Sequence, residues 1–99
     1  MWGQMSSEHQ YRASERIQVE LIEADVDIGF GLVDSALGEL RAGNLTFARR
    51  ALQDAEKVLL DIDERLRQID EERRGPFGPL VDELRKSIRA AESECAGAT

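Results

Sequence analysis

Four carboxylates recur at helical spacing early in the chain and are its clearest candidates for chemistry: Glu20, Glu23, Asp27 and Asp34. Carboxylates that share one side of a helix could bind a divalent cation or the basic residues of a partner. The same spacing is typical of a solvated helix face, which is the interpretation we favour. Asp25 falls on the opposite side of the helical wheel, where a bundle could bury it. It would then need a partner, for which we expect an arginine from another helix.

His9 and Cys95 are the only histidine and the only cysteine. Catalysis by His9 would need a nucleophile or a carboxylate brought to it by the fold, and a metal would need a pattern such as Glu-x-x-His, which the sequence lacks. Cys95 cannot close a disulfide within the chain, and no base or cationic cluster adjoins it to activate the thiol. We expect an exposed His9, a free thiol in the C-terminal tail, and a reducing compartment, the cytoplasm.

Gly29, Phe30 and Gly31 invite comparison with glycine-rich nucleotide-binding loops. Such a loop follows a strand and needs a third glycine three residues further on, where this chain has Asp34. Residues 20–28 instead have the pattern of a helix. We interpret the glycines as sites of a kink or of close helix contact. We therefore expect a protein that is not an enzyme, with no catalytic residue, cofactor or metal.

The composition is typical of one small domain built from amphipathic helices. Of the 99 residues, 41% are hydrophobic, 33% are charged and only 5% are aromatic. The net charge of −7 would repel nucleic acids and anionic membranes. No apolar run approaches the roughly 20 residues that span a bilayer. We therefore expect neither a nucleic-acid partner nor a membrane.

Glycine and proline divide the chain into three helices, which we expect at about 7–42, 44–74 and 79–95. Asn44 can cap the second helix, and Gly75 can end it in the left-handed conformation. Short loops connect antiparallel neighbours. We therefore predict an all-α, antiparallel up-down-up helical bundle, in which a long hairpin carries a shorter third helix.

These helices form a single domain, residues 7–95. Residues 1–6 are expected to be disordered or left over from cloning, with either Met1 or Met5 as the natural start. Residues 96–99 have nothing to hold them and are expected to form a disordered tail.

One apolar seam follows the second helix at spacings of four and three, which is the heptad pattern of a helix packed against an antiparallel neighbour. The seam consists of Ala48, Leu52, Ala55, Leu59, Ile62, Leu66 and Ile69. Beside the seam, Asp61 with Arg65 and Asp63 with Arg67 are spaced for ion pairs within the helix.

The first helix carries two apolar stripes instead of one. The first stripe contains Ile17, Leu21, Ala24, Ile28 and Leu32. The second contains Val19, Ile22, Val26, Phe30, Val33, Leu37 and Leu40. Their centres differ by roughly 150° on the helical wheel. Either the other two helices cover one stripe each, or a second copy of the protein covers one, or the segment from Gly29 to Gly31 kinks the helix.

The third helix, at its predicted length, would leave the hairpin near Gly43 covered on one side only. Uncovered apolar surface of that extent usually finds a partner, so we expect a homodimer. The candidate contacts come from both stripes and are Ile17, Leu21, Ile28, Phe30, Leu32, Val33 and Leu37.

The turn between the first two helices is similar to that of a tetratricopeptide repeat. The matching residues are Ala36, Gly43, Leu45, Ala48, Leu52 and Ala55. The resemblance covers residues 29–62, about one repeat, and implies two antiparallel helices that approach closely through small residues. Glu39 and Leu60 stand where the repeat has an aromatic residue and a proline, and a lone repeat cannot stack into a solenoid.

These patterns favour a non-catalytic module for protein–protein interaction or self-association. Its contacts would be apolar residues of the first helix, and a protein partner would present a basic or apolar surface. The alternative is a regulatory bundle that binds a small ligand or a metal, using the acidic residues of the first helix or a pocket near Gly29 and Gly31.

Overall fold

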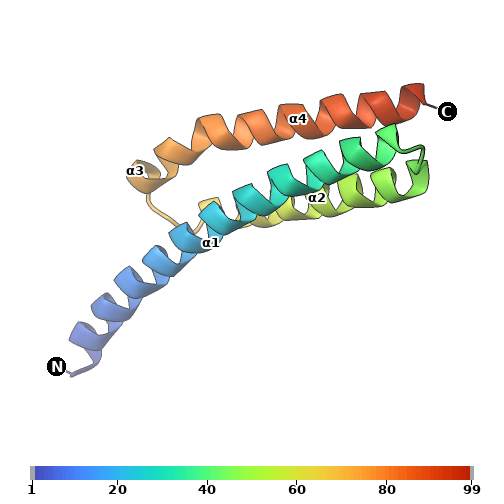
Figure 1. Ribbon diagram of the computed structural model, residues 1–99. Helices are drawn as coiled ribbons and strands as arrows, with labels where there is room; N and C mark the ends of the chain where they lie inside the picture. The colour runs from blue at the N-terminus through green and yellow to red at the C-terminus, as the bar shows by residue number, and fades with distance from the viewer. Residues whose placement is uncertain (1, 99) are drawn as a thin grey trace.

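The computed structural model describes the backbone of residues 2–98 and the side chains of residues 14–98. Helices α1 (Trp2–Arg41) and α2 (Leu45–Leu66) lie antiparallel and side by side, joined by a tight turn (Figure 1). The described residues contain no strand, and the molecule is elongated, with extents of 63 × 21 × 14 Å. The predicted long hairpin is therefore confirmed.

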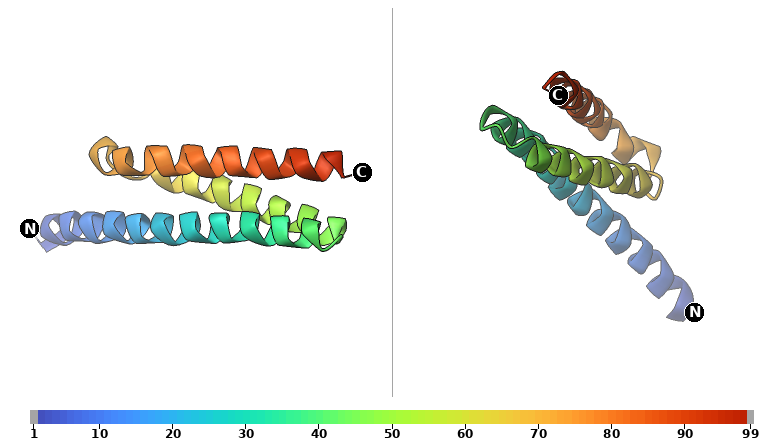
Figure 2. Two further views of the ribbon diagram at one scale, coloured as in Figure 1. Left: turned by 45° about the horizontal axis from the view of Figure 1, so that its top comes forward. Right: turned by 90° about the vertical axis from the view of Figure 1, so that its right-hand side faces the viewer.

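A third long helix completes the bundle. After α2, the short α3 (Glu71–Arg74) and the 3-10 turn η1 (Gly75–Phe77) lead into α4 (Gly78–Gly97). Helix α4 runs back along the hairpin in the same direction as α1 (Figure 2). The predicted all-α, up-down-up arrangement is confirmed.

Gly43 makes the turn between α1 and α2. Its φ of +83° lies in the left-handed region, which a glycine adopts without a steric penalty. Asn44 is the residue before α2, as predicted, but its side-chain amide donates to the Glu39 carboxylate at 2.8 Å instead of capping the helix.

The first helix is continuous through Gly29–Gly31. It also begins earlier than the predicted position of about 7, since Trp2 is already helical. The predicted exposure of His9 concerns a side chain outside the described residues, and Thr99 of the predicted tail is likewise outside them.

The predicted end of the second helix, at residue 74, is wrong. Helix α2 ends at Leu66, and residues 67–70 form a turn that leads to α3. This turn lets Ile69 enter the core from the loop. Gly75 has a right-handed φ of −50°, so it continues the chain from α3 into η1 instead of stopping a helix.

The third helix is longer than predicted, which changes how the hairpin is covered. Helix α4 continues to Gly97, and Cys95, predicted to lie in a free tail, is buried in the core with 4% of its surface exposed. Its thiol lies beside Leu52 and Arg49 near the start of α2. The third helix therefore reaches the hairpin end near Gly43, contrary to its predicted length, while the outer side of α1 at this end stays exposed.

The core lies between the three long helices. It is built from buried residues of α1, α2 and α4, with Ile69 and Phe77 closing one end: Ile22, Val26, Val33, Ala36, Ala48, Leu52, Ala55, Leu59, Ile62, Ile69, Phe77, Val81, Leu84, Ile88, Ala91 and Cys95. Gly29 lets α4 approach α1, because a Cβ atom built on it would lie 2.7 Å from Leu84 Cδ2. The predicted close helix contact at these glycines is thus found at Gly29.

Candidate interaction surface

The first apolar stripe of α1 faces away from the core. Ile17 and Ile28 are 53% and 52% exposed, Leu21 is 38% exposed, and Ala24 is also exposed. Leu32, at the edge, packs partly against the core. The second stripe is the one that packs on α2 and α4 together. One stripe of α1 is therefore covered by both neighbours, and the other is covered by neither.

The seven predicted contact residues are divided by this arrangement. Ile17, Leu21 and Ile28 are exposed. Phe30, Leu32 and Leu37 are half-buried and pack against the core, and Val33 lies inside it with 4% of its surface exposed. Val33 is therefore not available to a partner, because it is already part of the folded chain's own core.

The exposed side of α1 continues beyond this stripe as a regular heptad seam. At spacings of four and three from Ile17 onward, every position is exposed. We call this set the outer seam: Ile17, Leu21, Ala24, Ile28, Gly31, Ser35, Gly38 and Ala42. Its first half carries three large apolar side chains, and its second half carries only small residues.

Two glycines of the outer seam are not required by the packing of the chain itself. A Cβ atom added to Gly31 or Gly38 would meet no described atom within 4 Å, whereas one added to Gly29 would collide with Leu84. Glycine lowers helix stability relative to alanine by about 1 kcal/mol. Gly31 and Gly38 therefore lower the stability of α1, and no contact with the described residues requires a glycine at either position.

A polar network joins the hairpin arms next to the outer seam. Arg65 of α2 donates from Nε to Asp25 Oδ2 at 3.3 Å and from a terminal nitrogen to Gln18 Oε1 at 2.9 Å. The Gln18 amide in turn donates to Gln68 Oε1 at 3.0 Å. The prediction that an arginine from another helix pairs with Asp25 is confirmed. The network fixes how α1 is rotated about its axis, and thus where the outer seam points.

The expected ion pairs within the second helix are wrong. Arg65 pairs across the hairpin with Asp25, and Asp63 faces Arg85 of α4 at 3.4 Å. Arg67 pairs with Glu64 at 2.7 Å, three residues earlier. Helical spacing alone predicted these pairs, but Arg65 and Asp63 pair with other helices, and Arg67 pairs with a residue three positions earlier.

The four carboxylates at helical spacing, Glu20, Glu23, Asp27 and Asp34, are exposed. Among the residues whose side chains are described, no three His, Cys, Asp or Glu are grouped to hold a metal ion. Glu23 and Asp27 lie on the rim of a hollow of about 360 Å³ between α1 and the start of α4. Phe30, Phe77 and Leu80 also line this hollow. The space beside Gly29 itself is filled by Leu84.

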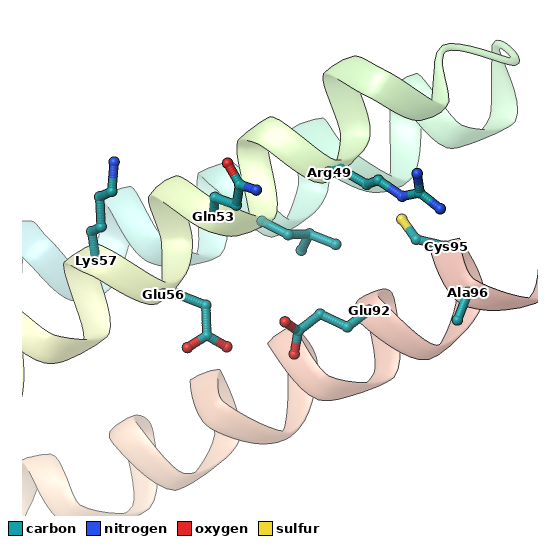
Figure 3. Close-up of a pocket in the computed structure, with 8 residues that line it drawn as sticks. Arg49, Gln53, Glu56, Lys57, Glu92, Cys95 and Ala96 are labelled. Carbon is teal, nitrogen blue, oxygen red and sulfur yellow. The ribbon is translucent and has the colours of Figure 1, made fainter.

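A larger groove of about 490 Å³ separates α2 from α4. Glu56 and Glu92 point toward one another across it, and Arg49 reaches over Cys95 (Figure 3). Desolvation, and then the charge and hydrogen bond of Glu56, raise the pKa of Glu92 above its ordinary value of 4.5, and Arg89 opposes this shift. Because Glu92 is an exposed residue, the desolvation is only partial.

One tertiary contact beside the interaction surface had no clear signal in the sequence. Glu15 is buried, with 5% of its surface exposed, and its carboxylate accepts from the Asp70 backbone amide at 2.7 Å. This bond ties the loop after α2 to α1, 55 residues away in the sequence. The period of the second stripe continues back to Glu15, which is the only hint that this carboxylate faces the bundle.

No protein-family model, curated protein or solved structure matches this chain. Among the described residues, no helix is both long enough and apolar enough to cross a membrane.

Proposed function

We propose that the protein is a non-catalytic interaction module that binds another helix along the outer seam of α1. The observation that supports this proposal most directly is the line of exposed Ile17, Leu21 and Ile28 on one face of a helix whose opposite face packs on the core. Large apolar side chains aligned at heptad spacing are typical of a helix that packs on a partner helix. The partner that we expect is a second copy of the chain, and we expect both in the cytoplasm.

The polar network supports the same role. Asp25 and Arg65 lock α1 against α2, so the outer seam is presented on a rigid element and not on a loop. A preorganised surface loses less conformational entropy when a partner binds.

A photo-crosslinking amino acid placed at Ile28 tests this function in the cells that make the protein. We expect covalent adducts with a protein from this position, and none from the matched position Asp82, an exposed residue of α4. Adding Leu21→Lys to the Ile28 probe should remove the adduct, because a charge in the seam opposes burial. Equal adducts at both positions, or none at Ile28, would contradict the proposal.

A further inference from the structure

The outer seam is complementary to itself when a second copy is turned end to end. In an antiparallel pair of helices with heptad seams, each layer joins one position of the first helix to one position of the second. If Ile28 lies opposite Gly31 of the second copy, then Leu21 meets Gly38 and Ile17 meets Ala42. Every large side chain in the seam is thus matched by a small residue.

We infer that two copies of the chain associate through their α1 outer seams, antiparallel, with the two-fold axis between residues 29 and 30. This inference rests on the proposed function and specifies how the two copies pair. It also gives Gly31 and Gly38 a role, because a residue without a side chain lets a leucine or isoleucine of the second copy pack against the helix backbone.

A parallel arrangement fits the same residues poorly. Ile17, Leu21 and Ile28 would each meet their own copies, and Gly31 and Gly38 would meet glycines. A layer of two glycines leaves a gap next to layers filled by two large side chains, and the atoms around such a gap lose van der Waals contacts. The division of the seam into a large half and a small half therefore favours the antiparallel pair.

The charges beside the seam neither favour nor oppose this register. Glu20 would lie next to Arg41 of the second copy, which is favourable, and Asp27 next to Asp34, which is not. All four are exposed, so each pair contributes little and the two kinds offset each other. Apolar packing then decides the association.

The extent of the seam predicts a weak dimer. Residues 17–42 span about 38 Å of helix, and a strip about 10 Å wide buries roughly 400 Å² on each copy. The total of roughly 800 Å² is below the roughly 1,200–2,000 Å² of stable complexes. We therefore expect reversible dimers that form at micromolar or higher concentrations.

Cysteine pairs test the register directly in a Cys95→Ala background. We expect Ile17→Cys and Ala42→Cys to form disulfide-linked dimers when the two variants are mixed, and neither to do so alone. Each variant then carries a single cysteine, so every disulfide must join two chains. A parallel dimer would crosslink Ile17→Cys with itself, which would overturn the inference.

Sedimentation equilibrium measures the role of the glycines. Gly31→Leu should weaken self-association by about 100-fold or more, because it blocks two symmetry-related contacts. It should not impair folding of the monomer, where the position is open. Gly38→Leu serves as a second test, and Ala90→Leu, on an exposed site of α4, is the matched control that should leave association unchanged.

The failures of the two proposals are distinguishable. If the chain stays monomeric up to millimolar concentration, the second copy is not the partner. If both glycine variants associate as well as the native chain, the copies do not pair through the outer seam in this register. The mass of the Ile28 photo-adduct then tests the proposed function separately. An adduct of twice the chain's mass supports both proposals, an adduct of another mass retains the function and refutes the second copy, and no adduct refutes the function.

Discussion

Two glycines two residues apart in α1 are expected to respond in opposite ways to the same substitution. In Gly31→Ala the new methyl group meets no described atom within 4 Å, so the gain in helix propensity of about 1 kcal/mol should appear in full. In Gly29→Ala the methyl would lie 2.7 Å from Leu84 Cδ2, and ordinary contact begins at 3.4 Å, so 0.7 Å must be relieved (3.4 − 2.7). Leu84 is fully buried and cannot move freely.

Overpacking of this kind costs about 1–3 kcal/mol, which outweighs or cancels the helix-propensity gain. We therefore expect Gly29→Ala to be less stable than Gly31→Ala by about 1–3 kcal/mol, and Gly31→Ala to melt about 4–8 °C higher than the native chain. Urea unfolding followed by circular dichroism at submicromolar concentration, below the range in which the dimer is expected to form, measures the monomer. In a Leu84→Val background the penalty at Gly29 should shrink. Equal stabilisation by both alanines would refute the packing described between α1 and α4.

Three further predictions concern polar groups. Glu15→Ala should destabilise the fold by about 1–3 kcal/mol and speed hydrogen exchange of the Asp70 amide, while Glu15→Gln, which keeps an acceptor, should do so less. Glu92→Gln should be more stable than the native chain at neutral pH, because the raised pKa of Glu92 means that its ionisation opposes folding. This advantage should fade as the pH falls through that pKa toward 4.5. Denaturant titrations in which the stability difference does not change with pH would contradict the prediction. A double-mutant cycle with Asp25→Asn and Arg65→Gln should give a coupling of about 0.5–1 kcal/mol, and additive effects would show that the pair does not hold the hairpin.

The main features of the fold could be predicted because they follow from local chemistry. Gly43 is needed for a left-handed turn, and the heptad seam of α2 requires a helix on the buried side. The pairing of Asp25 with an arginine followed from its angular position alone. The tetratricopeptide resemblance, the homodimer, the cytoplasmic location and the absence of enzymatic activity stay predictions.

The rest depended on tertiary contacts that periodicity does not contain. Ile69 fits the seam of α2, yet it reaches the core from a loop, and both arrangements give the same sequence spacing. The turn there is tied to α1 by Glu15, which accepts a hydrogen bond from the Asp70 backbone amide. The sequence predicts a free tail thiol at Cys95 because no base or cationic cluster adjoins it, whereas the structure places it beside Leu52 of α2. The exposed seam of α1 was recognised as one of two stripes, but only the packing of α4 decided which stripe is free.

The burial of Cys95 gives the protein a built-in probe of local opening. It is the chain's single thiol, and it lies near the end of α4 with almost no accessible surface. A thiol reagent reaches it when Arg49, which covers it from the groove, moves aside or when that end of α4 leaves the hairpin, so the labelling rate reports opening around Cys95. Comparing this rate with the urea-unfolding free energy would show whether α4 leaves the hairpin as a separate unit or only when the whole bundle unfolds.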